Sequence, residues 1–218
     1  MKRFWLLIIS TSLSLIGYSQ EYSERFQDAE LWTQIGINKT FTKKIEAAAS
    51  LAYRTDNNYA EFRSAFFQLD GSYELTKALK VGVGYRQSLD GDMDRDHRLM
   101  LKSRYKYRIK PFDLMARIRY DHKFGSKTSS LEQVFRSRFL VRYKKKKKKY
   151  RPFVFIESFY TLRYDFNDFD NVRIGIGSDL MITKDLTVGI AYLLQSEFNQ
   201  ARPTDRHILS LELAYQID

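Results

Sequence analysis

The chain has 218 residues, of which 44% are hydrophobic and 15% aromatic, so it can bury a sizeable core and is rich in residue types that favour strands. It has no cysteine and only three histidines, which excludes disulfides and thiolate chemistry and leaves few ways to build a histidine-based site. Lysine and arginine outnumber aspartate and glutamate by 37 to 26, giving a formal net charge of +11.

Residues 1–19 have the pattern of a secretory signal peptide. Lys2 and Arg3 precede an apolar stretch from Phe4 to Ile16, and small residues follow before Gln20. The apolar stretch is shorter than the roughly 20 residues that a membrane-spanning helix needs. We therefore expect an exported protein whose partners are outer-membrane lipids and glycolipids or small anionic solutes, and not nucleic acid.

Alternation with a period of two recurs from about residue 31 to the end of the chain. Between Leu99 and Ile109, one face carries leucine, tyrosine and isoleucine while the other carries four cations, Lys102, Arg104, Lys106 and Arg108. A helix would spread these charges around its circumference, whereas a strand separates them completely from the apolar face. This segment is therefore predicted to be a strand with one apolar and one basic face.

The whole pattern predicts an all-β fold of about eleven strands. The expected strands are 31–41, 45–56, 61–75, 79–88, 97–109, 114–124, 133–144, 150–164, 171–182, 186–197 and 206–217. Tight connections such as 42–44 and 183–185 alternate with longer polar ones such as 89–96 and 198–205. Short turns on one rim and longer loops on the other are typical of an outer-membrane barrel, whose short turns are periplasmic.

Two architectures are compatible with the alternation. A soluble exported ligand-binding barrel would have its apolar face inside, whereas a transmembrane barrel would have it against lipid. The strand number favours the membrane, because a barrel of much more than eight strands encloses more space than side chains readily fill. Aromatic residues near both ends of the apolar faces, such as Tyr53 and Tyr192 at one end and Tyr73 and Tyr215 at the other, match two interfacial girdles. We therefore predict a transmembrane antiparallel up-and-down β-barrel of about 10–12 strands in the cell outer membrane.

An odd strand number conflicts with the even number of bacterial single-chain barrels. We therefore favour ten or twelve strands over eleven, with residues 20–30 forming an extra strand or an N-terminal segment in the lumen. Residues 31–218 are assigned to the barrel itself.

The inward positions of three adjacent predicted strands form a basic wall that faces the lumen. Its expected members are Arg98, Lys102, Arg104, Lys106, Arg108, Arg117, Arg119, Lys123, Arg136, Arg138 and Arg142. Only Asp121 opposes them on that wall, and the expected lumen acids of the other strands are Glu46, Asp70, Glu74, Glu157, Asp179 and Glu212. Either these acids neutralise the wall and close the lumen, or the lumen is an open path that attracts anions.

Several polar positions resemble those of the outer-membrane barrel proteins of domain-of-unknown-function family 2490. The resemblance rests on Trp32, Arg54, Gly84-Tyr85, Arg136-x-Arg138, Pro152, Glu157-Ser158-Phe159, Arg173-x-Gly175-x-Gly177 and His207-Ile208. It implies a fold and an envelope location but no activity. It also implies the barrel-insertion machinery as a partner during assembly, although this chain ends on Asp218 rather than on the usual aromatic residue.

Candidate catalytic residues are scarce. The three histidines, His97, His122 and His207, are expected on the lipid face near the long-loop rim. Outer-membrane lipid-modifying enzymes place a serine and a histidine there. The candidate nucleophiles are Ser126, Ser129 and Ser130. No acid stands where it would orient a histidine ring, and the loop with Asp90, Asp92, Asp94 and Asp96 lacks the bidentate glutamate of a calcium loop. We therefore predict no enzyme, no metal and no cofactor, and expect a small channel or a structural envelope barrel.

Overall fold

The computed structural model describes residues 25–125, 132–144, 148–162 and 167–217, and these residues form an all-β structure. The alternating segments become eleven long strands because their apolar and polar side chains point to opposite faces. The strands are β1 (Phe26–Thr40), β2 (Ile45–Asp56), β3 (Glu61–Glu74), β4 (Leu79–Asp90), β5 (Arg95–Ile109), β6 (Phe112–Gly125), β7 (Glu132–Tyr143), β8 (Tyr150–Leu162), β9 (Asn167–Met181), β10 (Leu186–Glu197) and β11 (Thr204–Ile217).

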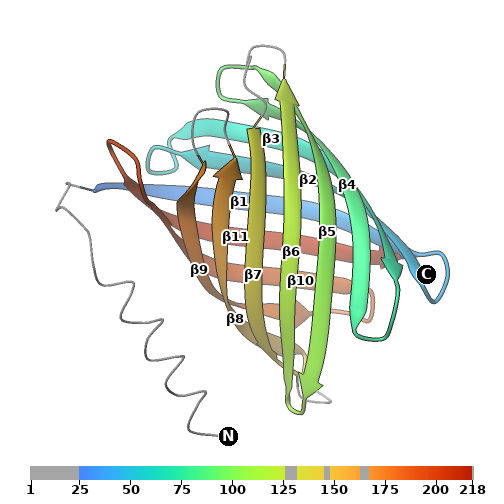
Figure 1. The fold of residues 1–218 in the computed structure, drawn as a ribbon. Helices are drawn as coiled ribbons and strands as arrows, with labels where there is room; N and C mark the ends of the chain where they lie inside the picture. Colours follow the sequence, from blue (N-terminus) through green and yellow to red (C-terminus); the bar gives the residue numbers. More distant parts are fainter. Residues whose placement is uncertain (1–24, 126–131, 145–147, 163–166, 218) are drawn as a thin grey trace, which may run out of the picture.

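The strands form one closed barrel in which chain neighbours are also neighbours in space (Figure 1). Every consecutive pair is antiparallel. The barrel closes by a parallel pairing of β1 with β11, from Phe26 opposite Thr204 to Lys39 opposite Ile217. The preference for ten or twelve strands was therefore wrong, because a parallel closing pair allows an odd number.

The first strand is longer than the sequence pattern indicated. Strand β1 begins at Phe26 and includes residues 26–30, and the backbone N–H of Phe26 donates a hydrogen bond to the carbonyl oxygen of Pro203 at 3.0 Å. The predicted signal peptide, residues 1–19, lies outside the described residues. No helix in the described part of the chain is long and apolar enough to cross a membrane.

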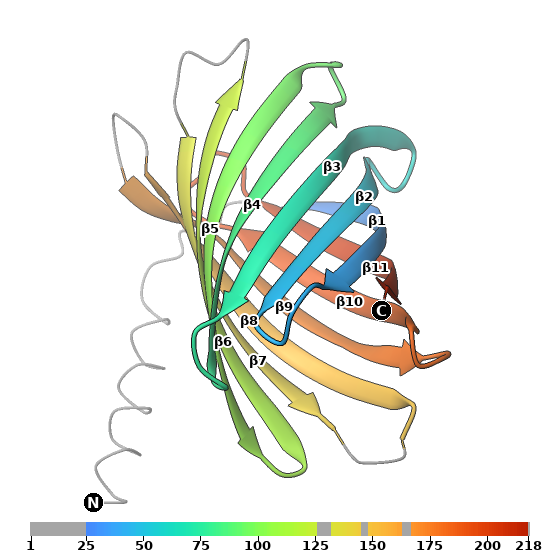
Figure 2. The same cartoon turned by 90° about the vertical axis from the view of Figure 1, so that its right-hand side faces the viewer.

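The barrel has its apolar side chains outside. Leu101, Val83, Ile118 and Ile176 are each about 60% exposed on the outer face, as are many other large hydrophobic side chains of all the strands. The inward positions instead carry most of the buried charged groups, including Glu30, Asp121 and Glu157. A soluble barrel would show the reverse distribution, so this surface belongs in lipid. Figure 2 shows how the long strands wrap around the interior at a steep tilt.

The interior is not uniformly polar. Inward side chains of β7 to β11 form an apolar cluster of Leu140, Phe155, Ala191, Leu193 and Ile208. Gly177 allows this packing, because a Cβ atom there would lie 2.6 Å from the Cβ of Ala191 and 2.8 Å from the ring of Phe153. Apolar side chains therefore fill part of the lumen next to the basic wall.

Candidate functional site: the basic lumen

Cations stand side by side on the inner face of β5, β6 and β7. In one row, Lys102 of β5, Arg119 of β6 and Arg136 of β7 lie opposite one another on neighbouring strands. In the next row, Arg104, Arg117 and Arg138 are arranged in the same way. Like charges directly opposite each other on a sheet are destabilising. These two rows therefore need anionic partners from elsewhere in the lumen.

Carboxylates supply partners for nine of the eleven predicted wall cations. The ion pairs are Arg98 with Asp121, Lys102 with Asp70, Lys106 and Arg108 with Asp113, Arg117 with Glu157, Arg119 with Asp121, Lys123 with Asp96, Arg136 with both Glu157 and Asp121, and Arg142 with Asp179. Two of the acids, Asp96 and Asp113, lie on the same wall, so the expectation that Asp121 alone opposes it was wrong. Within the described residues, Arg104 and Arg138 have no ion pair.

The remaining predicted lumen acids are arranged around the wall rather than across it. Glu46 of β2 pairs with Lys80 of β4, and Asp179 of β9 pairs with Arg142 of β7. Glu74 and Glu212 lie on inward-facing positions and make no ion pair within the described part of the chain. Since these pairs join strands two apart, they stiffen the wall without spanning the lumen.

Two buried carboxylates organise the centre of the wall. Glu157 is 1% exposed and accepts hydrogen bonds from Arg117 at 2.8 Å, Arg136 at 3.0 Å and Arg173 at 3.3 Å. Asp121, also 1% exposed, accepts one from Arg119 at 2.5 Å. Each of these carboxylates is therefore shared by more than one arginine.

A third buried carboxylate, Glu30, organises the long-loop end of the lumen. The indole Nε1 of Trp32 donates to Glu30 Oε2 at 2.6 Å, and Arg206 lies 3.2 Å from Glu30 Oε1. Arg63 completes the group through its own ion pair with Glu30. This cluster fixes the edge of the Trp32 ring.

Arginine and aromatic side chains alternate through the middle of the lumen. Arg136 and Arg173 lie on the ring of Phe159. Arg173 and Arg54 lie on the ring of Trp32, and Arg54 and Arg86 lie on the ring of Phe66. The six distances from guanidinium carbon to ring centroid are 3.8 to 4.9 Å. We call these seven side chains the luminal ring. Each aromatic face attracts two guanidinium groups and holds them apart. Five members, Trp32, Arg54, Arg136, Phe159 and Arg173, are among the residues on which the family resemblance rests.

The centre of the lumen carries more positive charge than its acids neutralise. Eight buried or half-buried arginines lie on the inner face, and within the described residues their ion pairs go only to Glu157 and Asp121: Arg54, Arg86, Arg98, Arg117, Arg119, Arg136, Arg138 and Arg173. Eight cations against two carboxylates leave an excess of six positive charges. Two like charges 4 Å apart repel by about 4 kcal/mol at the effective dielectric near a protein surface.

Two of these arginines have no acceptor among the described residues. Within the described residues, neither Arg54 nor Arg138 makes a hydrogen bond or an ion pair, and the Nε of Arg138 is buried without a partner. Their recorded contacts are with aromatic faces, Arg54 with Trp32 and Phe66, and Arg138 with Phe155 at 3.5 Å. Stacking occupies the face of a guanidinium and leaves its N–H edges available.

The lumen opens into a cavity at the short-turn end. The cavity has a volume of about 290 Å³ and is lined by polar side chains that include Glu46, Asp70, Ser72 and Gln216. The Glu46 side chain is 46% exposed. Solvent therefore reaches Glu46 at this end of the lumen.

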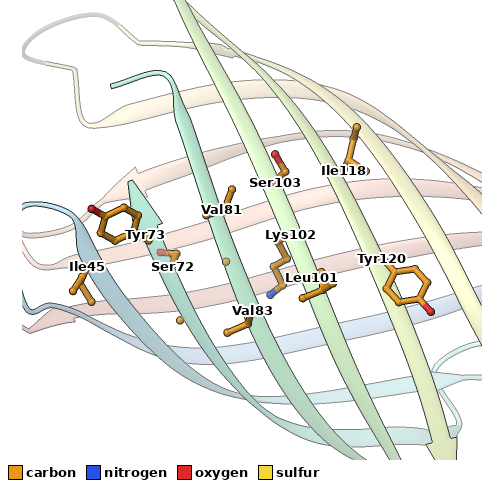
Figure 3. A pocket seen from close by; sticks show the side chains of 12 residues that line it. Ile45, Ser72, Tyr73, Val81, Val83, Leu101, Lys102, Ser103, Ile118 and Tyr120 are labelled. Carbon is orange, nitrogen blue, oxygen red and sulfur yellow. The ribbon is translucent and has the colours of Figure 1, made fainter. Parts of the chain in front are cut away.

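A separate groove of about 690 Å³ lies against the outer face of β2 to β6 (Figure 3). Ile45, Tyr73, Val83, Leu101 and Tyr120 line it. The groove is on the lipid side of the barrel wall and is therefore separate from the path through the lumen.

The three histidines lie at the long-loop rim and contact tyrosines. Tyr85 Oη lies 2.6 Å from His97 Nδ1, Tyr192 Oη lies 2.5 Å from His207 Nδ1, and His122 packs against Tyr120. The candidate nucleophiles Ser126, Ser129 and Ser130 lie outside the described residues. Asp90 accepts a hydrogen bond from the backbone of Asp94 at 2.9 Å, and no group of three or more metal-ligating side chains occurs in the described part of the chain.

Of the luminal ring, only Arg136 was among the predicted lumen residues. Trp32, Arg54, Phe159 and Arg173 were named only for the family resemblance, and Phe66 and Arg86 were missed. The alternation of side chains along each strand could have placed Trp32, Phe66 and Arg86 inside. These three residues occupy positions on the same face of the sheet as Arg54 or Asp70, which point into the lumen. The signal was overlooked because aromatic residues on a membrane barrel were assigned to its outer girdles.

A closed barrel with an apolar outer face and a basic, ion-paired interior defines a transmembrane β-barrel. The chain belongs to the family described as Protein of unknown function (DUF2490), whose model matches residues 29–206. No curated protein is significantly similar to the chain.

Several solved structures are similar to this one at low sequence identity. A structure described as the KdgM porin is similar with a TM-score of 0.47 and 12% identity, covering 72% of this chain and 80% of that one. A structure described as a bacterial polysaccharide outer membrane secretin has a TM-score of 0.45 and 11% identity, covering 76% of this chain and 73% of that one. The beta domain of the Bordetella autotransporter BrkA has a TM-score of 0.46 and 9% identity, covering 76% of this chain and 81% of that one.

Proposed function

We propose that this protein is an outer-membrane barrel that admits and passes small anions through its arginine-rich lumen. The observation that carries the proposal is the excess of eight central arginines over two carboxylates, Glu157 and Asp121. Cations are repelled from such a region, whereas mobile anions lower its electrostatic energy. Because side chains of the luminal ring narrow the path, the conductance of a single barrel should be small.

Planar-bilayer recording under a salt gradient tests this proposal. The reversal potential should lie toward the chloride equilibrium potential. Arg54→Glu and Arg138→Glu each lower the lumen charge by two without removing the partner of any carboxylate described in the structure, so both should shift the reversal potential toward cation permeation. Arg202→Glu makes the same change on an exposed loop and should shift it far less.

Two results would reject the proposal. One is a preference for cations in the parental protein, and the other is a reversal potential that is equally affected by the luminal and the loop variants. If folded protein gives no conductance at all, the barrel is a closed structural component of the envelope.

The outer-membrane location is part of the proposal and has its own test. The folded protein should fractionate with outer membranes and migrate differently on gels before and after boiling, because an intact barrel resists detergent unfolding. Recovery from the periplasm without detergent would contradict this location.

A further inference from the structure

Arg54 is a half-buried cation for which the described residues provide no acceptor. Its guanidinium lies 3.8 Å from the centroid of Trp32 and 4.9 Å from that of Phe66. A guanidinium carries five N–H donors, and a buried charge without hydrogen-bond partners is costly. Arg54 therefore occupies a position that favours a ligand able to accept several hydrogen bonds.

Arg54 shares its two aromatic neighbours with other cations, because Arg173 also lies on the Trp32 ring and Arg86 also lies on the Phe66 ring. The nearby carboxylates already have several partners. Glu157 accepts from Arg117, Arg136 and Arg173, while Glu30 is shared by Trp32, Arg63 and Arg206. Neither of these two carboxylates forms an ion pair with Arg54.

The orientation of the neighbouring side chains indicates what kind of ligand fits. Trp32 and Phe66 lie against the guanidinium of Arg54, so the N–H edges that lie in its plane remain free. Arg86 donates hydrogen bonds to Gln68 Oε1 from Nε at 2.9 Å and from Nη2 at 2.6 Å. Its Nη1 is therefore available to donate to a ligand. Planar N–H pairs match the paired oxygens of a carboxylate or phosphate better than a spherical ion.

We infer that Arg54 and Arg86 bind a small oxyanion, a carboxylate or a phosphate, between Trp32 and Phe66. This site deepens the proposed function, because the anion reaches it through the lumen. The bound oxyanion satisfies Arg54 and offsets part of the central positive charge. Binding can be measured without conductance, so the two proposals can fail separately.

Trp32 provides a direct probe of this site. The sequence contains two tryptophans, Trp5 and Trp32, and Trp5 lies in the predicted signal peptide. Trp32 is therefore the only tryptophan of the processed chain, and Trp5→Phe leaves it as the only one when residues 1–19 are retained. In the folded, detergent-solubilised full chain, inorganic phosphate should produce a saturable change in Trp32 fluorescence. Sodium chloride at the same ionic strength should produce a smaller change, because one chloride cannot accept both N–H groups of an edge in the same geometry.

Substitutions of Arg54 separate binding from general charge effects. Arg54→Gln should abolish the saturable change, and Arg54→Lys, which keeps the charge but loses the planar edge, should weaken phosphate binding about tenfold. The control Arg202→Gln should behave like the parental protein. Band shift on unboiled gels verifies folding, and if Arg54→Gln does not fold, Arg54→Lys decides the matter.

The site is refuted if phosphate and chloride act alike, or if the Arg54 variants titrate like the parental protein. Phosphate binding that depends on Arg54 in a barrel that does not conduct would reject the anion path and keep the site. Anion-selective conductance without this binding would reject the site alone.

Discussion

Trp32 and Arg54 are directly opposite each other on β1 and β2, and the guanidinium of Arg54 lies 3.8 Å from the centroid of the Trp32 ring. Arg173 of β9 lies 4.7 Å from the same centroid although two strands separate β9 from β1 in the barrel wall. The indole also donates to the buried carboxylate of Glu30 at 2.6 Å. One side chain thus joins two parts of the lumen that the backbone ladder does not bring together.

Replacing Trp32 should therefore weaken the barrel. Trp32→Leu removes two cation–π contacts, each worth about 2 kcal/mol when desolvated, and one hydrogen bond. We expect the free energy of unfolding in lipid vesicles, measured by urea titration, to fall by about 2–4 kcal/mol. Tyr59→Leu, on an exposed loop, should change it by less than about 0.5 kcal/mol. Equal effects of the two substitutions would contradict a structural role for Trp32.

Glu157→Gln should be among the most damaging single substitutions in the lumen. It removes the only carboxylate recorded as a partner of Arg117 and of Arg173 in the described residues, and the main one of Arg136. Breaking such a buried network costs about 3–5 kcal/mol. The same urea titration provides the measurement, with Glu61→Gln at the exposed rim as the matched control. An unchanged unfolding midpoint would show that the arginines find other counter-ions.

The apolar outer face predicts a depth-dependent cost for charge. Leu101 is 58% exposed near the middle of β5, where it should face lipid tails. Leu101→Arg should therefore destabilise the vesicle-embedded barrel by about 2–4 kcal/mol, whereas Leu101→Phe should be nearly neutral. If the arginine were tolerated without loss, this face would be in contact with water.

The rim histidines should not be needed for any lipid chemistry. His97 and His207 contact tyrosine hydroxyl groups rather than a carboxylate that could orient them as bases. His97→Ala, His122→Ala and His207→Ala should therefore leave the lipid composition of the envelope unchanged when it is measured by mass spectrometry. Loss of a hydrolysis or lipid-modification product in any one variant would indicate an enzyme.

Period-two alternation was sufficient to predict the strands. All eleven occur close to their predicted ranges, because each segment such as Leu99 to Ile109 separates its two faces along its own length. The parallel closure could not be predicted this way, since β1 and β11 share no turn that would fix their register. That information resides in contacts between residues about 180 positions apart.

The arrangement of the lumen was harder to predict than its charge. Parity places Arg117 and Glu157 on the inner face, but it does not say that β6 and β8 bring them within 2.8 Å. The apolar side of the lumen was missed because β8 carries large hydrophobic residues on both faces, with Phe155 inside and Ile156 outside. Binary patterning cannot identify the inner face of such a strand.

The parallel pairing of β1 with β11 limits how the chain could be circularly permuted. Antiparallel neighbours can be joined by a two-residue turn, whereas parallel neighbours require a long crossover. The paired segment runs from Phe26 opposite Thr204 to Lys39 opposite Ile217, which corresponds to roughly 45 Å of strand at about 3.3 Å per residue. A linker that joined the present ends would have to travel that distance through lipid or through the filled lumen. New ends opened in another loop would therefore not yield a barrel with the same topology, and a split into two co-expressed fragments is the more suitable way to vary its connectivity.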